Sequence, residues 1–243
     1  MGFRTVRTAS SEPRILLIAS LAQTGDADRL AGCVDGADAV LLRLAKSGPA
    51  AKTLQKTGAS LPDLPWGGWL EDISAKKVEI LVEAGCDFTV FPAASRILAA
   101  PQDDKVGKIL QVEASLGEGL LRAINDLPVD AVLATDTSEA DGSIAWHHLM
   151  LLQRLANLLV NPLLTMVSAS VTAGELKALM EAGVGGMVVE ADADKPGGLK
   201  ELRRLINELP PRSLHKRRKA EALLPYAGSV KDTEPEEDEE EYE

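Results

Sequence analysis

Eight short apolar runs, each followed by a stretch of helical character, fill the chain from Arg14 to about Pro210. Strands that alternate with helices of ten or more residues form βαβ units and a parallel sheet. Eight such units in roughly 200 residues match the strand number and length of a (β/α)8 barrel. The runs are Arg14–Ser20, Ala37–Leu42, Trp66–Leu70, Asp87–Pro92, Lys108–Val112, Ala131–Thr135, Pro162–Val167 and Gly186–Glu190. We therefore expect an α/β protein built on one closed (β/α)8 TIM barrel.

Two of the stretches between these runs carry clear helix signals. Between Ser74 and Gly85, apolar residues recur at steps of three and four, which places them on one face of a helix. Ser74 is expected to cap the start of this helix, and Gly85 to follow its end. Thr172, with Glu175 three residues later, predicts a capping box at the start of another helix.

A similar turn precedes every second strand. The four segments begin Gly36-Ala-Asp-Ala, Gly85-Cys-Asp-Phe, Val129-Asp-Ala-Val and Gly183-Val-Gly-Gly. Such a turn needs a glycine to stop the helix and a small polar residue before the strand, so turn chemistry alone accounts for the recurrence. A duplicated ancestor is the alternative interpretation.

The charge of the chain is concentrated at its end. The net charge is −11, but residues 232–243 hold nine acids and no base, so the other 231 residues carry about −2. We expect a disordered N-terminus over 1–12, the barrel over 13–210, a basic C-terminal helix over 211–226 and a disordered acidic tail over 227–243. The basic run Arg212–Lys219 is either a partner patch or a solvated helix face that the acidic tail can approach. No aromatic residue interleaves with it, so we expect no strong binding of nucleic acid.

Several features bear on the compartment and on metal binding. No apolar run approaches the ~20 residues that span a bilayer, and the N-terminus lacks the apolar segment of a secretory signal. Cys33 and Cys86 are isolated, which favours two buried thiols in a reducing cytoplasm over a disulfide. His147 and His148 are adjacent without a third ligand at zinc spacing, so we expect histidines on the surface of a helix start.

Catalytic residues of a (β/α)8 barrel lie at the carboxyl ends of its strands. Glu113 and Asp136 end neighbouring strands, and two adjacent carboxylates could hold Mg²⁺ or Mn²⁺ or form salt bridges across the rim. Arg43 and Lys46 are the candidate catalytic cations. The candidate substrate-binding residues are Glu71, Ser115, Ser168 and Glu190.

The segment Ile109-Leu-Gln-Val-Glu-Ala-Ser, followed by a helix and by Leu127-Pro-Val-Asp-Ala-Val-Leu-Ala, resembles the HpcH/HpaI aldolase and citrate lyase β-subunit superfamily. The segment from Lys76 to Pro92 is similar to the third helix and fourth strand of that family. The resemblance covers strands two to eight loosely and strands three to six best. It implies a metal-assisted C–C lyase or aldolase that stabilises an enolate of a small carboxylate or acyl-CoA substrate.

Within this resemblance, Glu113 matches the metal-ligand glutamate of the family. The second family ligand would fall at Ser138, two residues beyond Asp136, and the family's substrate-binding arginine would fall near Gly68 or Trp69. Arg43 or Lys46 would then supply the missing cation from a neighbouring strand.

Two classes of function remain open. The first is a divergent metal-dependent lyase that binds a small-molecule substrate. The second is a barrel without catalysis, acting as a scaffold or as a binder of a flavin or a phosphate-bearing ligand. The motif Trp66-Gly-Gly-Trp69 favours the second class if it forms a flat apolar surface, whereas it could equally fill the core. A homo-oligomer is compatible with either.

Overall fold

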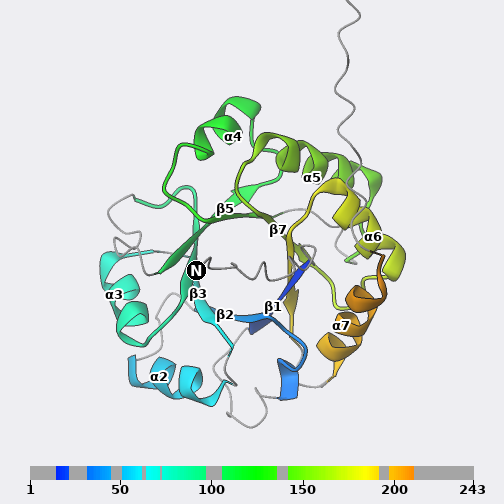
Figure 1. Ribbon diagram of the computed structural model, residues 1–243. Coiled ribbons are helices and arrows are strands. Elements are labelled where there is room, and N and C mark those ends of the chain that lie inside the picture. Colours follow the sequence, from blue (N-terminus) through cyan, green and yellow to red (C-terminus); the bar gives the residue numbers. More distant parts are fainter. Residues whose placement is uncertain are drawn as a thin grey trace, which may run out of the picture. The chain divides into compact units, whose positions relative to one another are not determined.

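The computed structural model describes residues 15–21, 32–44, 51–61, 64–71, 73–96, 106–135, 142–191 and 197–210. In this part of the chain, eight parallel strands pair in sequential order and close into a barrel (Figure 1). The strands are β1 (Leu16–Leu21), β2 (Ala39–Leu44), β3 (Trp66–Leu70), β4 (Phe88–Pro92), β5 (Gly107–Glu113), β6 (Ala131–Thr135), β7 (Leu163–Val167) and β8 (Gly186–Glu190). The ring closes where β1 pairs with β8, from Leu16 opposite Gly186 to Ser20 opposite Glu190. The predicted fold is confirmed.

Helices surround the barrel on its outside (Figure 1). Those described are α2 (Ala51–Ser60), α3 (Ala75–Glu83), α4 (Glu118–Ile124), α5 (Trp146–Leu158), α6 (Ala173–Ala182) and α7 (Gly198–Glu208). An aliphatic layer fills the space between helices and strands, and the largest fully buried side chains of the described residues are all leucines. Since burying one leucine side chain stabilises a fold by about 1.5–3 kcal/mol, this layer is the main source of stability.

The predicted helix ends form as expected. The hydroxyl of Ser74 accepts the backbone N–H of Lys77 at 3.4 Å and caps α3, and Gly85 follows this helix with φ +83°. At α6, the Thr172 hydroxyl accepts the Glu175 N–H at 3.3 Å, while the Glu175 carboxylate accepts the Thr172 N–H at 2.9 Å. This is the predicted capping box, which satisfies two N–H groups that the helix cannot.

The recurring turn has one structural role at three of its four positions. Each aspartate accepts the backbone N–H of a residue on the preceding odd-numbered strand at 2.8–2.9 Å and donates its own N–H to the carbonyl of that residue at 2.7–2.8 Å. The pairs are Asp38 with Leu17, Asp87 with Trp66, and Asp130 with Lys108. Before β8, Gly185 donates its N–H to the Leu163 carbonyl at 2.8 Å without a carboxylate. Turn chemistry therefore accounts for the repeat at the start of each even strand.

The last described helix fastens the first turn of the barrel. Arg203 of α7 donates from Nε to the Gly36 carbonyl at 2.7 Å, and its Nη2 binds the Asp38 carboxylate. Gly36 has φ +96°, and a Cβ there would lie 3.1 Å from the Leu199 carbonyl oxygen. A glycine is thus required both by the backbone conformation and by the approach of α7. These contacts join the two ends of the barrel domain.

The interior of the ring is filled by a second apolar cluster, separate from the outer layer. Every strand contributes one buried side chain to it, as in a packed barrel core rather than a pore. These side chains are Ile18, Leu41, Trp69, Val90, Ile109, Leu133, Leu164 and Val188. Because side chains alternate along a strand, this set establishes which positions of each strand face inward.

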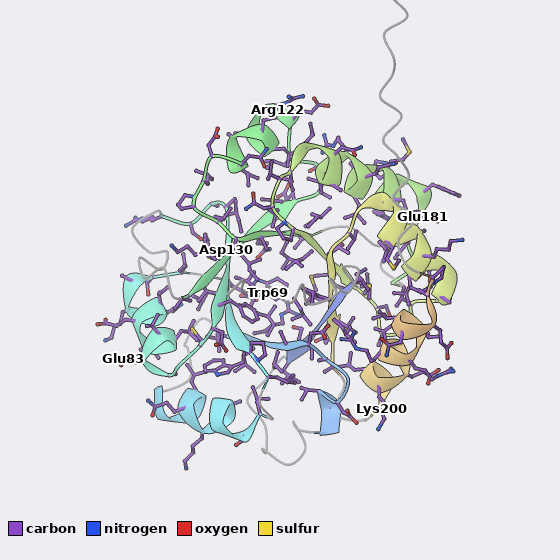
Figure 2. The ribbon with its side chains drawn as sticks, viewed as in Figure 1. Trp69, Glu83, Arg122, Asp130, Glu181 and Lys200 are labelled. Carbon is purple, nitrogen blue, oxygen red and sulfur yellow. The ribbon has the colours of Figure 1, made fainter. Side chains whose placement is uncertain are left out.

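The two tryptophans of β3 lie on opposite sides of that strand. Trp66 belongs to the outer layer, and its ring lies where a Cβ on Gly58 would meet it at 2.9 Å. Trp69 lies inside the ring of strands (Figure 2). Both are 6% exposed, so the motif forms no flat apolar surface, and that interpretation is wrong. The core-filling alternative is correct.

Both cysteines are free and buried, as predicted. Burial raises the pKa of the Cys86 thiol from 9.0 to about 11, with a further contribution from the Asp87 carboxylate. The expectation of two surface histidines is half wrong: His147 is exposed, but His148 is buried and its Nδ1 accepts the Ala145 N–H at 3.3 Å. His148 thus caps the start of α5, because the N-cap residue Ala145 has no side-chain acceptor of its own.

The predicted N-terminal segment 1–12, the basic helix 211–226 and the acidic tail 227–243 lie outside the described residues and stay predictions. Within the described part of the chain, none of the helices has the length and apolar character needed to cross a bilayer.

Candidate active site at the mouth of the barrel

The inward-facing positions become polar at the carboxyl end of the strands. Ser20, Arg43 and Gln111 each lie two residues beyond the apolar interior side chain of their strand and so face inward as well. Further polar residues on the inward side lie at or just beyond the ends of the strands and form the rim of the mouth. The rim residues are Glu71, Glu113, Thr135, Ser168 and Glu190. Most of the predicted site residues therefore share one end of the barrel, where enzymes of this fold place their chemistry.

A connected layer of side chains forms the floor of this mouth. The Arg43 guanidinium lies over the ring of Trp69, with Cζ 4.9 Å from the ring centroid. On its other side, the Trp69 indole Nε1–H donates to Gln111 Oε1 at 2.8 Å. Since Arg43, Trp69 and Gln111 lie on β2, β3 and β5, this layer spans a large part of the barrel. Holding the Gln111 oxygen on Trp69 leaves the amide NH₂ of Gln111 as a donor for another group.

The Arg43 guanidinium makes no hydrogen bond or ion pair with any other described residue. Its side chain is half-buried, and the attraction of the indole face holds it in place. The predicted alternative, a salt bridge from Glu113 to Arg43 across the rim, does not form between these two residues. Their strands, β2 and β5, are separated by β3 and β4 on one side of the ring and by four strands on the other. The cation and the carboxylate therefore face each other across the mouth.

Glu113 is exposed, and its hydrogen-bond partner among the described residues is the Ser115 hydroxyl, which donates to Oε2 at 3.5 Å. The backbone around Glu113 is better fixed than its side chain. Arg154 of α5 donates from Nη2 to the Ala114 carbonyl at 2.8 Å and to the Leu116 carbonyl at 2.9 Å. A half-buried arginine thus braces the loop that presents Glu113 and Ser115 to the mouth.

Ser20 is the most buried polar residue of the mouth, with 1% of its surface exposed. Its hydroxyl has no hydrogen-bond partner among the described residues. Since buried polar groups are nearly always hydrogen-bonded, this hydroxyl is available to bind a polar atom of a ligand or an internal water. The β1–β8 register sets Ser20 opposite Glu190.

The remaining rim residues divide into two groups. Ser168 is engaged locally: its hydroxyl lies 2.8 Å from the Ser170 hydroxyl and accepts the Ser170 N–H at 3.2 Å. Thr135 donates to the Val112 carbonyl at 3.2 Å. In contrast, Glu71 and Glu190 are exposed and form no ion pair with a described residue. Among the described residues, the mouth thus presents Arg43 as a cation without an ion pair, together with several carboxylates.

The second predicted cation, Lys46, and the second predicted metal ligand, Asp136, lie outside the described residues and stay predictions. Among the residues that are described, no group of three or more His, Cys, Asp or Glu side chains could hold a metal ion. Of the two predicted metal ligands, the structure describes Glu113, whose exposed carboxylate accepts the Ser115 hydroxyl. The described residues by themselves therefore do not make a metal centre.

Two residues of the floor were not among the predicted site residues. The sequence pattern places Trp69 either on an apolar surface or in the core, and it gives Gln111 no role. The sequence does indicate both residues, because side chains two positions apart on a strand lie on the same face. Gln111 lies two residues before Glu113, and Trp69 lies two residues before Glu71, so each is expected to face the barrel interior below a candidate rim residue.

Comparison of the sequence with protein-family models gives no match, and no curated protein matches either. Solved structures match in fold. Thiamine phosphate pyrophosphorylase from Pyrococcus furiosus superposes with a TM-score of 0.61 at 13% identity, over 81% of this chain and 97% of that one. Orotidine 5'-phosphate decarboxylase from Pyrococcus horikoshii gives 0.60 at 15% identity, over 79% and 100%. N-(5'-phosphoribosyl)anthranilate isomerase from P. furiosus gives 0.56 at 13%, over 80% and 100%.

These likenesses show a (β/α)8 barrel of the generic TIM type. At such identities they show the fold alone, because unrelated chemistries share this fold. The resemblance to the HpcH/HpaI aldolase superfamily is not among these findings and stays a prediction.

Proposed function

We propose that this protein is an enzyme that binds a small carboxylate in the mouth of the barrel and acts on the carbon next to it, in the manner of a lyase or aldolase. The observation that carries the proposal is the Arg43 guanidinium on the Trp69 ring, which forms no hydrogen bond or ion pair with another described residue. A half-buried cation that has no counter-ion among the described residues, in a mouth that holds several carboxylates, is arranged to take its anion from a ligand.

The floor offers matched donors to such an anion. The guanidinium can donate two parallel hydrogen bonds to a carboxylate, and the free amide NH₂ of Gln111 lies on the same tryptophan platform. The buried hydroxyl of Ser20 adds a group that can donate or accept. A flat, acceptor-rich anion of a few atoms fits this donor set better than a cation or an apolar ligand.

The carboxylate of Glu113 supplies the reactive group in this proposal. Placed across the mouth from Arg43, it can remove a proton from the carbon beside a carbonyl group of the bound acid, which leaves an enolate, or return one. The charge that develops on the substrate oxygens is then stabilised by the guanidinium, which needs no rearrangement because Trp69 already holds it. Glu113 acts as the acid–base group and Arg43 as the electrostatic one.

A divalent cation is a separate proposal. Mg²⁺ or Mn²⁺ would bind Glu113 together with Asp136 and would polarise the substrate oxygens. The described residues supply one of these two carboxylates, so no step above depends on a metal.

The binding proposal can be tested through Trp69, because one of the three tryptophans of the chain forms the floor of the proposed site. In a Trp146→Phe background, which removes the exposed indole, titration with oxalate or pyruvate is expected to change the tryptophan fluorescence in a saturable way. Arg43→Gln is expected to weaken binding at least about tenfold, since a charge-assisted hydrogen bond contributes about 1.5–3 kcal/mol.

A matched control removes an arginine elsewhere. Arg122→Gln takes an exposed guanidinium from the outer side of α4 and should leave the titration unchanged (Figure 2). Equal binding by the wild type and Arg43→Gln would refute the site, as would no binding of either acid up to about 10 mM. If the acids bind but neither C–C cleavage of a longer 2-oxo acid nor exchange of the pyruvate methyl protons with solvent is detectable, the protein is a binder and the catalytic part of the proposal is wrong.

A phosphate-bearing substrate is the second candidate. The start of α7 favours it, because its N-cap is Gly197 and no side chain caps the first N–H groups of this helix. The loops after β7 and β8 commonly hold phosphate in this fold, and three neighbours named above carry phosphate or phosphoribosyl in their names. Inorganic phosphate that binds Arg43→Gln as tightly as the wild type, and does not displace oxalate, would support this candidate, whereas phosphate that competes with oxalate would occupy the Arg43 site instead.

A further inference from the structure

Ser20 and Glu190 form a polar pair on adjacent strands at the mouth of the barrel. The β1–β8 register sets the two residues opposite each other, and the Ala191 N–H continues this pairing by donating to the Ser20 carbonyl at 2.8 Å. The residues two positions earlier on both strands belong to the interior cluster, so both side chains face inward. The hydroxyl and the carboxylate are therefore neighbours on the inner face of the barrel.

Both side chains are free to bind a ligand. The Ser20 hydroxyl is buried and makes no hydrogen bond with a described residue. The Glu190 carboxylate is exposed and forms no hydrogen bond or ion pair with one either. Since this carboxylate repels an anion, the ligand group that suits the neighbouring hydroxyl is a positively charged donor. An ammonium group fits, because it carries three N–H donors and oxygen atoms of both side chains can accept them.

The charges at the mouth favour the same chemistry. Among the described residues on its inward side, three carboxylates accompany the Arg43 guanidinium, namely Glu71, Glu113 and Glu190. A bound carboxylate that neutralises Arg43 leaves these three acids without a counter-ion. A ligand that also carries a positive group offsets part of this excess, whereas a second negative group on the ligand adds to it.

The order of the strands lets one small molecule reach both charges. Arg43 lies on β2 and Glu190 on β8, and β1 alone separates these two strands. Neighbouring strands lie about 4.8 Å apart, so the backbones of β2 and β8 are within roughly 10 Å of each other. Because both side chains face inward, a carboxylate and an ammonium group joined by a few carbon atoms can span the remaining gap.

We propose that the ligand of this mouth is a small carboxylic acid that also carries a protonated amino group. Its carboxylate binds Arg43, and its ammonium group binds Glu190 and the Ser20 hydroxyl. This inference rests on the proposed function, because it starts from the carboxylate site at Arg43 and adds the class of substrate. Glu190 and Ser20 then determine specificity, since they distinguish an amino-bearing acid from an acid of the same size that ends in a methyl group.

Matched pairs of acids test this specificity in the full-length Trp146→Phe protein, with tryptophan fluorescence as the signal. The amino-bearing acids are glycine, β-alanine, γ-aminobutyrate and δ-aminovalerate, and each is compared with the unbranched acid that has a methyl group in place of the ammonium group. At least one of them is expected to bind about fivefold or more tightly than its methyl counterpart. Glu190→Gln should bring this ratio of Kd values close to one. It should bind oxalate at least as tightly as the parent, because a like charge is removed.

Two further variants locate the preference for the amino group. Ser20→Ala should lower the ratio of Kd values about threefold, because one acceptor of the ammonium group is lost. It should not lower the stability in urea unfolding, since the hydroxyl that it removes has no partner among the described residues. Glu79→Gln takes an exposed carboxylate from α3, on the outside of the barrel, and should leave the ratio unchanged.

The outcomes separate this inference from the proposed function. If oxalate and pyruvate bind but every amino-bearing acid binds no better than its methyl counterpart, the inference is overturned and the carboxylate site stands. A preference that Glu190→Gln or Ser20→Ala leaves intact also overturns it. If oxalate, pyruvate and all the amino-bearing acids fail to bind, the proposed function and this inference are both wrong.

Discussion

Adding one methyl group inside β3 is expected to destabilise the protein strongly. A Cβ on Gly67 would lie 2.4 Å from the Phe88 ring and 2.4 Å from the Phe88 carbonyl oxygen. The backbone at Phe88 pairs with Gly67 in the β3–β4 register, so that oxygen cannot move without disturbing the barrel. We therefore predict that Gly67→Ala costs more than an ordinary overpacked core substitution.

The magnitude follows from comparison with two other glycines. On the opposite side of β3, a Cβ on Gly68 would lie 2.7 Å from the Leu81 side chain, which can rotate away. Overpacking costs about 1–3 kcal/mol, and Gly→Ala recovers about 0.4–1 kcal/mol from the unfolded chain. We expect a loss of about 3 kcal/mol for Gly67→Ala and about 1 kcal/mol for Gly68→Ala. Gly119 lies in α4 with open space around it, so Gly119→Ala should raise the free energy of unfolding by about 0.5–1 kcal/mol.

Urea unfolding followed by far-UV circular dichroism measures all three. For a domain of this size, about 3 kcal/mol also corresponds to a fall in Tm of roughly 6–12 °C. If Gly67→Ala is as stable as Gly68→Ala, the close approach of β3 to Phe88 does not exist and the argument is refuted.

Four further predictions concern three single residues and one segment. Glu113→Gln should abolish any thermal stabilisation by Mg²⁺ or Mn²⁺, and a wild type without a metal-dependent shift at millimolar concentration would exclude the metal proposal. Arg203→Ala should lower the free energy of unfolding by about 1–2 kcal/mol, because its bonds to the β1–β2 turn are half-buried; no loss in urea unfolding would contradict this. The pKa of Cys86 is raised to about 11, so the folded state keeps its proton while the unfolded thiol ionises. The wild type should thus lose stability relative to Cys86→Ala as pH rises from 9 toward 11, and parallel curves would disprove it. Finally, Arg212–Lys219 should not bind DNA or RNA with sub-micromolar affinity at physiological salt, as measured by fluorescence anisotropy of the full-length chain.

The alternation of apolar runs predicted the barrel because each run is too short for anything but a strand and is covered on both sides. Three strands, including Trp66–Leu70, have the predicted bounds. The others shift by one or two residues at one or both ends, since a strand end depends on its neighbour's register. Residues 39–44 show this: β2 continues through Arg43 and Leu44 because both pair with β3, which no local pattern in the sequence reveals.

The site was predictable only in part. Strand ends identified Arg43 and Glu113, because the position along a strand determines the end of the barrel at which a residue lies. The pairing of Arg43 with Trp69 could not be predicted, since it depends on the β2–β3 register and on a side-chain rotamer. Asp136 and Lys46 lie beyond the predicted strands, where the sequence pattern gives no position, and outside the described residues.

Closure of the ring also has a kinetic consequence. In the finished barrel every strand has two neighbours, so no row of backbone N–H and C=O groups is left open to pair with another molecule. During synthesis, however, β1 emerges first and the strand that completes it, β8, emerges last. Until then the apolar sequence Leu16–Leu21 presents an open edge, as does the most recently added strand. Pairing of β1 with β8 thus removes both open strand edges from the native barrel. Before β8 docks, the chain has two open edges that can pair with another molecule, so slow docking of β8 favours aggregation.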